Sequence, residues 1–340
     1  MTYYPDMGKK SANQPGIQKI AAESGVSTAT VSRVLNRHPY VSDTVRMKVL
    51  AAARKNGYAP TIFSTHSLFG ILGMSGNDCY SFSSYFNQVL RSTSQVLFQA
   101  GCNVQIFSRN LFPYILPNTF RGVMVFSGSA ASFFQRIKIP CVTVNDPVDG
   151  AFNVVTDHGE SCRIAVEYLL ELGHRRIGFL HSADRLWGTL ERLRGWHESL
   201  ASAGIPVSEH VHADFRNPER DIPSAAAALL RKNITALIVE GEDNGLIADH
   251  ELKRQGIRIP EELSLVSFEQ SGCSKFMSPA HTTVCQDFDA LGRCAAETLI
   301  DIVQHPALRE KIPSMQILHN HLIKRESCAP PKTGGADIRI

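Results

Sequence analysis

The stretch from Gly25 to Asn36 reads GVSTATVSRVLN and decides how the first part of the chain folds. Gly25 interrupts a helical pattern at a point where a tight turn needs a residue in the left-handed conformation. Ser27 then has the side chain of a helix N-cap, and Asn36 is suited to end the same helix. The stretch therefore predicts a turn followed by one short helix.

Helical spacing continues on both sides of this stretch. Before it, the residues from Ile17 to Ser24 place one face at positions i, i+3, i+4 and i+7. After a loop that contains Pro39, a third helix is predicted with an apolar face from Val45 to Ala53, and Gly57 ends it. Three short helices with a glycine turn between the first two indicate a helix-turn-helix arrangement.

The second helix of such a unit enters the major groove of DNA. Val26, Val31 and Leu35 can pack inward, which leaves small and polar side chains outward. Arg33 can pair with a guanine through two hydrogen bonds, and the hydroxyl groups can bind phosphates. A short helical bundle with a solvated basic face is the alternative. The side chains expected at the DNA are Ser27, Thr28, Ala29, Thr30, Ser32, Arg33, Asn36 and Tyr58.

The charge of the chain is unevenly distributed. The whole chain has a formal net charge of +3, but residues 1–60 hold nine Lys and Arg against three acids. This segment therefore carries +6, and the rest of the chain carries −3. A basic head on a slightly acidic body indicates that only the head meets a polyanion.

Length and composition narrow the class of protein. With 340 residues, 43% of them hydrophobic, the chain is expected to form two or three globular domains. Its start has no apolar segment of a signal peptide, and no apolar run approaches the ~20 residues of a membrane span. The eight cysteines are scattered without a C-x-x-C pair, as expected for reduced thiols in a cytoplasmic protein.

From residue 69 onward, apolar runs of strand length alternate with helical patterns such as 161–172, 190–203 and 224–232. This alternation predicts parallel sheets with helices on both faces, and its length favours two lobes over one. The expected strands are Phe69–Met74, Val104–Phe107, Val123–Phe126, Cys141–Val144, Ile177–Leu180, Ala236–Val239 and Leu263–Phe268.

The chain resembles the lac repressor/galactose repressor family of bacterial regulators. The resemblance is long, follows the order of the family's motifs and covers nearly residues 16–330. In the head it is carried by Ile17–Ala21, Ser24–Ser27, Thr30–Asn36, Val41, Ser42, Arg46, Val49, Ala52 and Gly57–Pro60. In the body it is carried by Leu172–Leu180, Arg192–Trp196, Ser264–Gln270, Pro279–Val284, Gln286 and Arg325–Pro330.

The resemblance implies an all-α helix-turn-helix head and an α/β body of two doubly wound parallel-sheet lobes, like a periplasmic binding protein. The expected segments are a leader at 1–15, the head at 16–59, a hinge at 60–68, an N-terminal lobe at 69–156 and 287–313, a C-terminal lobe at 157–286 and 314–330, and a tail at 331–340.

The hinge departs from the family pattern. In the family this segment forms a helix whose leucine wedges into the minor groove of the DNA. Here the stretch Phe63–Leu68 lacks the usual arginine, and Leu68 lies one residue later than the family's leucine. Leu68 is either this wedge, and then a DNA contact, or the first residue of the first strand. A weaker hinge would weaken the coupling between body and head.

The resemblance also implies an effector site between the lobes. Arg192 matches an arginine that points into the cleft and binds effector oxygens with its rigid fork of donors, with a surface ion pair as the alternative. Glu269 replaces an aspartate that accepts ligand hydrogens. Tyr85 and Phe86 fall where relatives place aromatic rings against a ligand, unless they pack in the core. Gln286 completes the expected set.

Two further departures concern the body. Glu240–Asp243 replaces a segment whose asparagine often lies near the ligand, so that contact is lost or replaced. Only Ser108–Phe120 separates the second and third strands, and Pro113 and Pro117 forbid a long helix there. The N-terminal lobe is therefore expected to be trimmed.

The sequence predicts a transcription regulator, in the family usually a repressor, that reads a near-palindromic DNA operator as a homodimer. A small effector would control it; a sugar suits an Arg/Glu pair, and a nucleobase is possible. An activator, and a small-molecule binder with a degenerate head, are the alternatives. A solute-binding protein would lack the head. The motifs of the common enzyme classes are absent from the sequence, and neither metal, cofactor nor membrane partner is expected.

Overall fold

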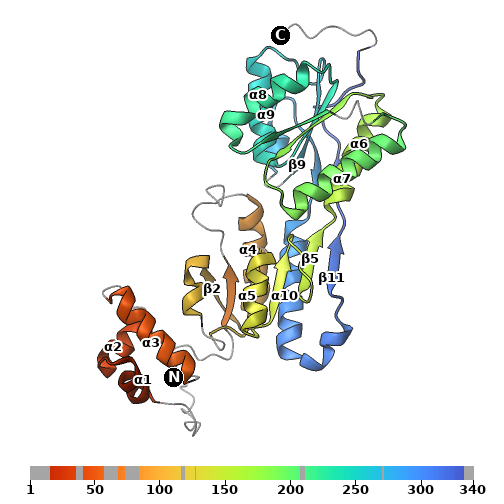
Figure 1. Cartoon of the computed structure of the whole chain (residues 1–340). Helices are drawn as coiled ribbons and strands as arrows, with labels where there is room; N and C mark the ends of the chain where they lie inside the picture. Colours follow the sequence, from red (N-terminus) through yellow and green to blue (C-terminus); the bar gives the residue numbers. More distant parts are fainter. Residues whose placement is uncertain are drawn as a thin grey trace, which may run out of the picture.

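The computed structural model describes residues 16–35, 41–56, 68–72, 84–115, 119–126, 128–206, 211–269 and 272–332. Figure 1 shows a helical head, an N-terminal lobe and a C-terminal lobe. The predicted fold class, an all-α head with an α/β body of two lobes, is confirmed. Among the described residues, no helix combines the length and apolar character that a membrane crossing requires.

The head consists of three short helices, α1 (Ile17–Ser24), α2 (Thr28–Leu35) and α3 (Asp43–Lys55). They enclose one small core because each has an apolar face. Ile20 of α1, Val31 of α2 and Val49 of α3 are completely buried in it. Burying one aliphatic side chain of this size stabilises the fold by about 1.5–3 kcal/mol. The core therefore fixes α2, the predicted DNA-reading helix, against its neighbours.

Local sequence fixes the turn between α1 and α2. Gly25 ends α1 in the left-handed conformation, with φ of 67°, and its N–H donates to the carbonyl of Ala21. The Ser27 Oγ accepts the N–H of Thr30 at 3.1 Å, which is the geometry of an N-cap. The predicted turn and the predicted cap are both confirmed.

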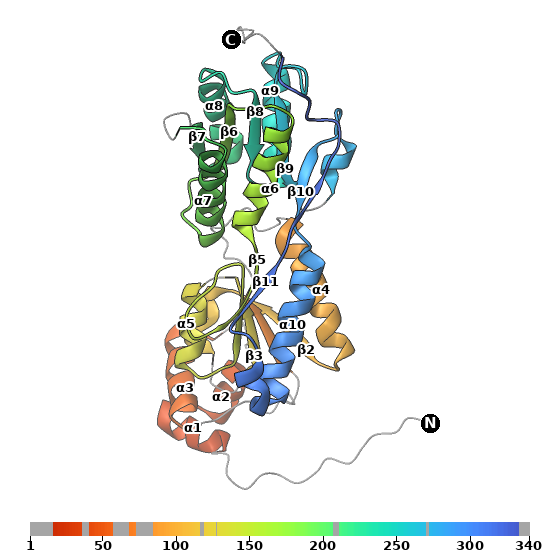
Figure 2. The same cartoon turned by 90° about the vertical axis from the view of Figure 1, so that its right-hand side faces the viewer.

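The N-terminal lobe is built on a six-stranded sheet. Its strands are β1 (Leu68–Leu72), β2 (Asn103–Phe107), β3 (Gly122–Val125), β4 (Cys141–Val144), β5 (Phe152–Thr156) and β11 (Met315–Leu318). Its helices include α4 (Ser84–Gln99), α5 (Gly128–Arg136) and α10 (Phe288–Gln304). All neighbours are parallel, in the order β11-β5-β4-β3-β1-β2. The α4–α10 pair covers one face of the sheet, and α5 covers the other (Figure 2).

The C-terminal lobe repeats this architecture. Its strands are β6 (Ile177–Ser182), β7 (Val211–Phe215), β8 (Ala236–Val239), β9 (Ser264–Glu269), β10 (Thr282–Cys285) and β12 (His321–Ile323). Its helices include α6 (His158–Glu171), α7 (Trp187–Ser202), α8 (Pro218–Leu230) and α9 (Glu242–Arg254). The order is β12-β10-β9-β8-β6-β7, and only β12 is antiparallel to its neighbour. α6 and α7 pack on one face of the sheet, and α8 and α9 on the other.

The chain passes between the lobes three times, after β5, after β10 and after β11. The third passage corrects the predicted boundary between 313 and 314. β11 pairs in parallel with β5 in the N-terminal sheet, and only β12 joins the C-terminal sheet beside β10. The error has a physical reason. β11 is an edge strand with Met315 and Ile317 exposed, so it lacks the continuous apolar run that marks a strand buried on both faces.

Of the two alternatives for Leu68, the structure has the strand. Leu68 opens β1 opposite Asn103 of β2 and is buried in the core on the α5 side of the sheet. A side chain held in the lobe core cannot wedge between base pairs. This corrects the inclusion of Leu68 among the DNA contacts and in the hinge segment, because Leu68 belongs to the N-terminal lobe.

The described part of the short insert between β2 and β3 contains no long helix, as predicted. It forms the 3-10 helix η2 (Arg109–Tyr114). Aromatic rings fill the space beneath it, since Phe107 stacks on Phe120 with ring centroids 5.0 Å apart, and Phe112 stacks on Phe133 of α5 at 4.6 Å. Stacked aromatic rings therefore complete the core of the N-terminal lobe at this edge.

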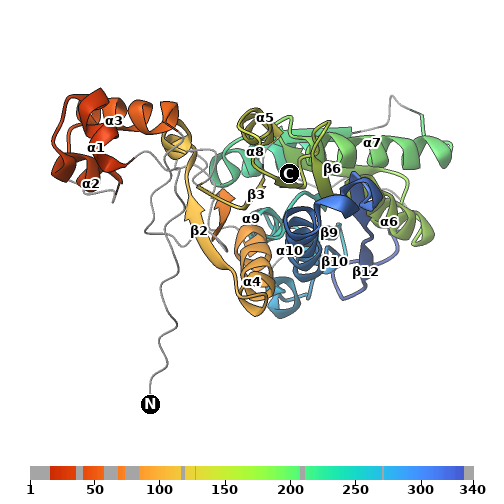
Figure 3. The same ribbon diagram turned by 90° about the horizontal axis from the view of Figure 1, so that it is seen from below.

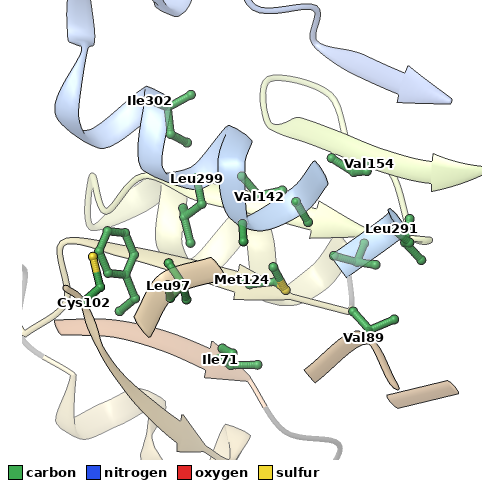
Figure 4. Close-up of a cluster of buried hydrophobic side chains, with 14 of the residues drawn as sticks. Ile71, Val89, Leu97, Cys102, Met124, Val142, Val154, Leu291, Leu299 and Ile302 are labelled. Carbon is green, nitrogen blue, oxygen red and sulfur yellow. The ribbon is translucent and has the colours of Figure 1, made fainter. Parts of the chain in front are cut away.

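The main core of the N-terminal lobe lies between the sheet and the α4–α10 pair. Figure 4 shows Leu97, Leu299, Met124 and Val142 gathered there from two helices and two strands. Seen from below, α4 and α10 lie side by side (Figure 3). Gly292 of α10 permits this approach, because a Cβ there would collide with the Ser92 side chain of α4. The two helices are thus held at close contact.

In the C-terminal lobe, α6 and α7 make a similar close contact. A Cβ at Gly195 of α7 would lie 2.8 Å from the carbonyl carbon of Gly159 in α6, and would collide with its oxygen. The next residue, Trp196, is completely buried near Phe179 of β6. This packing fixes the position of α7, the helix that carries Arg192.

We predict that Gly195→Ala destabilises the C-terminal lobe by about 3 kcal/mol, the upper end of the usual cost of overpacking, because the methyl group meets backbone. Both tryptophans of the chain lie on α7, so their fluorescence reports this lobe during urea unfolding. Ser202→Ala, an exposed change in the last turn of α7, is the control and should leave the midpoint unchanged. Equal midpoints for both variants would contradict the prediction.

Candidate functional site

A cleft of about 590 Å³ lies between the two lobes and receives side chains from both. Several strands of both sheets end at it. This is where ligands bind in open α/β sheets, at the carboxyl ends of parallel strands. Among the described residues, the N-terminal lobe contributes Tyr85, Phe126, Val144, Asn145, Asp146 and Phe288. The C-terminal lobe contributes polar groups that include His158, Ser182, Thr189, Arg192, Glu240 and Asn244.

Arg192 reaches the cleft from the second turn of α7, as the sequence predicts. Its Nη1 donates to Glu240 Oε1 at 2.8 Å, and the two side chains are only 13% and 11% exposed. The guanidinium carbon lies 5.2 Å from the centre of the Phe268 ring. Arg192 is therefore a cleft residue that already has an anionic partner within the protein.

Glu240 is a functional candidate that the sequence analysis did not name as a site residue, although it noted that residues 240–243 depart from the family pattern. It directly follows β8, and the donors around it satisfy its carboxylate. The backbone N–H of Ser182 donates to Oε2 at 2.8 Å, and the Thr189 hydroxyl donates to Oε1 at 2.9 Å. Gly241 follows with φ of 89°, a conformation that other residues rarely adopt. A charged residue at the carboxyl end of a buried strand was the available signal.

Gln286 lies at the second passage between the lobes and contacts the first. Its Nε2 lies 3.2 Å from His158 Nδ1 and donates to Ser161 Oγ at 3.4 Å. Thr156 Oγ1 also lies 3.3 Å from His158 Nδ1. An amide N–H can only donate, so the contact with Gln286 requires an unprotonated His158 Nδ1. These groups link the passages after β5 and after β10.

His158 is buried at the start of α6, with 4% of its surface exposed. Burial and the nearby Arg192 charge lower its pKa well below the ordinary value. The Trp187 ring packs against it edge to face, with centroids 5.3 Å apart. A Cβ at Gly188 would lie 3.0 Å from the imidazole. His158 is therefore a neutral, enclosed part of the cleft wall.

The two predicted aromatic contacts separate in the structure. Tyr85 lines the cleft and meets Phe288 and Phe126 edge to face, with ring centroids 4.9 and 5.9 Å apart. Burial raises the pKa of its hydroxyl. Phe86 packs on Phe126 at 5.2 Å, is buried, and is not among the described residues that line the cleft. Core packing, the alternative for Phe86, is what the structure has, because successive helical residues face different directions.

The predicted effector residue Glu269 ends β9, where its backbone pairs with Cys285 of β10. This places the residue at the carboxyl end of the sheet, but its side chain lies outside the described atoms. Asn145 was not predicted. It adopts the left-handed conformation, with φ of 53°, and its Oδ1 accepts the N–H of Thr156 at 2.8 Å. Asn145 therefore brings the end of β4 to the first passage between the lobes.

The second surface of interest is the outer face of α2. Thr28, Ala29 and Arg33 are exposed there, and Ser32 is half-buried. The hydroxyls of Ser27 and Thr30 lie 2.9 Å apart at the start of the helix. The structure thus brings six of the predicted DNA contacts onto one helix and its cap. The other two in the head, Asn36 and Tyr58, lie outside the described residues.

Comparison with known proteins places both parts of the chain. Residues 16–61 match the family model described as bacterial regulatory proteins, lacI family. Residues 166–328 match the periplasmic binding protein-like domain. The repressor PurR of Klebsiella pneumoniae (strain 342) is 27% identical over 339 residues, which cover 92% of this chain and 96% of PurR. The chain belongs to the lac repressor family of bacterial regulators. It is a DNA-binding transcription regulator and not an enzyme.

Other similarities agree with this family membership. The probable repressor ExuR of Bacillus subtilis (strain 168) is 24% identical over 87% of this chain and 94% of its own length. The lac repressor dimer bound to operator shares 23% identity and a TM-score of 0.67 over 93% of this chain and 99% of its own. A lacI-family regulator from Enterococcus faecium with bound ribose gives a TM-score of 0.69 at 20% identity, over 78% of this chain and 100% of its own. At such identities the structures establish the shared fold.

The lowered pKa of His158 predicts how stability depends on pH. The folded state holds this group neutral, while the unfolded chain takes up a proton below pH ~6.5. Its contribution is therefore complete above that pH and is lost as the pH falls toward the folded-state pKa, by at most about 1.4 kcal/mol per pH unit. We expect His158→Gln to lose less stability than the wild type between pH 7.5 and pH 5.

Urea unfolding followed by tryptophan fluorescence at the two pH values measures this difference. His321→Gln, a change of an exposed histidine on β12, is the matched control and should behave like the wild type. If His158→Gln and the wild type lose the same stability on acidification, the neutral state of His158 is not what the fold requires.

Proposed function

We propose that this chain is a transcriptional repressor that binds a near-palindromic operator as a homodimer and is controlled by a small effector in the interlobe cleft. The observation that carries the proposal is the exposed outer face of α2, with Arg33, Thr28 and Ala29, on a packed helix-turn-helix. Small side chains beside one guanidinium match the donors and apolar contacts that read base edges. PurR and ExuR, both named as repressors, support the sign of regulation.

The homodimer follows from the geometry of reading DNA. One head of this size offers a single recognition helix, and two heads one DNA turn apart read the two halves of a palindrome. The lac repressor to which this chain is similar binds its operator as a dimer. Symmetry of this kind doubles the phosphate and base contacts and therefore raises affinity well above that of one head.

Control by an effector rests on the cleft. A ligand there would contact the two lobes at once, through Tyr85 and Asn145 of the N-terminal lobe and through Thr189 of the C-terminal lobe. Because three short passages join the lobes, such a ligand changes the angle between them, provided that it binds one angle better than the other. Regulators of similar fold are described with cellobiose and with ribose, which supports a sugar-like effector.

Selection of bound sequences from a random DNA pool, at stated salt, tests the proposal. A recovered near-palindrome, bound at least 10³-fold more tightly than non-specific DNA, would support it. Binding that ignores sequence and disappears with salt would overturn it and favour the second candidate, a small-molecule binder with a degenerate head.

We expect Arg33→Ala to weaken binding to the selected site by about 10- to 100-fold, the effect of losing one base-pairing arginine. Non-specific binding should change far less. Lys55→Ala is the matched control, since it removes the same charge from an exposed side chain at the end of α3. Fluorescence anisotropy at constant salt measures both. Equal losses for the two variants would mean that Arg33 acts only through its charge.

A further inference from the structure

We propose that Glu240 is a specificity-determining residue. By pairing with Arg192 it prevents an anionic ligand from binding that arginine, so that the cleft selects neutral or cationic effectors rich in hydrogen-bond donors. This inference rests on the proposed role of the cleft as the effector site. It goes beyond that role because it assigns a function to a residue, and a charge class to the ligand.

The first argument is that Arg192 is already neutralised. Its Nη1 donates to Glu240 at 2.8 Å, and both side chains are largely buried. The pair belongs to one lobe, since Arg192 lies on α7 and Glu240 follows β8, and Ser182 and Thr189 of the same lobe hold the carboxylate in place. Movement of the lobes therefore does not separate the pair. A carboxylate or phosphate of a ligand would have to displace a carboxylate that three donor groups, Arg192 among them, hold in place.

The second argument is the charge of the cleft. Its described lining residues include five carboxylates, Asp146, Asp184, Glu219, Glu240 and Asp243, against two guanidinium groups, Arg192 and Arg216. Arg216 is exposed at the rim. An anionic ligand would enter a negative region, and Arg192, the one enclosed cation among the described lining residues, is already paired. Displacing Glu240 would leave a buried carboxylate without its partner, which is strongly unfavourable.

The third argument concerns what the cleft offers instead. Carboxylates only accept hydrogen bonds, so they favour ligands that bring hydroxyl or amine donors. The rings of Tyr85, Phe126 and Phe288 line the same cleft. Aromatic faces suit the C–H faces of sugar rings and also attract cations. A polyhydroxylated or amine-bearing small molecule fits both sets of groups.

Chemical rescue with a small anion tests directly whether Glu240 occupies the anion position beside Arg192. In Glu240→Ala, Arg192 loses its partner and a space the size of a carboxylate opens beside it. We expect a lower Tm that acetate restores, while chloride at the same ionic strength does not. Acetate should leave the wild type unchanged relative to chloride. Glu219→Ala is the matched control, because it removes an exposed carboxylate from the same cleft without touching Arg192.

Either of two results would overturn the proposal that Glu240 keeps anions from Arg192. One is acetate stabilising the wild type as much as Glu240→Ala. The other is Glu240→Ala showing no response to acetate beyond that to chloride. If Glu240→Ala does not fold, Glu240→Ser, which opens nearly the same space beside Arg192 and keeps a small polar group, takes its place in the same comparison.

Specificity is tested with glucose, glucosamine and glucuronate, which share one ring and differ in charge. In the wild type we expect glucosamine to raise the Tm more than glucuronate, and in Glu240→Gln we expect the ratio of glucuronate to glucose affinity to rise at least 10-fold. Equal responses of the wild type to glucosamine and glucuronate would overturn the proposal. Selecting operator DNA with both proteins separates the two proposals, since α2 reads DNA without Glu240.

Discussion

The body of this protein depends on one topological constraint, which is that the chain passes between its two lobes three times. Thr156, His158 and Gln286 lie at two of these passages, and their side chains contact one another at 3.2–3.3 Å. Because the passages lie side by side at the edge of the cleft, the lobes can tilt but cannot drift apart. Burial keeps His158 neutral, so the contact needs no counter-ion. The three passages thus form the hinge between the lobes.

The hydrogen-bonded polar groups around Arg192 in the cleft all belong to one lobe. Arg192, Glu240, Thr189 and Ser182 form a hydrogen-bonded set wholly in the C-terminal lobe. A buried ion pair rarely adds net stability compared with apolar packing, and breaking it by removing one partner is costly. We therefore interpret the set as a device for specificity. It keeps a carboxylate in the cleft wall and withholds the positive charge that an unpaired arginine would offer.

Sequence reasoning succeeded where structure is local. Gly25 and Ser27 act on residues three or four positions away, so their roles could be predicted directly. The buried strand Ala236–Val239 could be predicted because it is a continuous apolar run. Contacts between distant elements were not readable. Glu240 meets Arg192 across 48 residues, and no local pattern records that pairing. The assignment of β11 to the C-terminal lobe was wrong for a related reason, since the sequence of an edge strand with exposed alternate positions does not indicate which sheet it joins.

The division by lobe bears on how an effector would signal. The Arg192–Glu240 pair moves as one body with α7 and β8, so its geometry is the same at every lobe angle and cannot by itself favour one of them. A ligand shifts the equilibrium only through contacts that differ between the two states. Those contacts must come from the opposite wall, where Tyr85 and Asn145 face the cleft. Asn145 is held at φ of 53° by accepting the N–H of Thr156, at the first passage between the lobes. Under the proposed function, the C-terminal wall would therefore select the ligand, and the N-terminal wall would convert its binding into a change of angle.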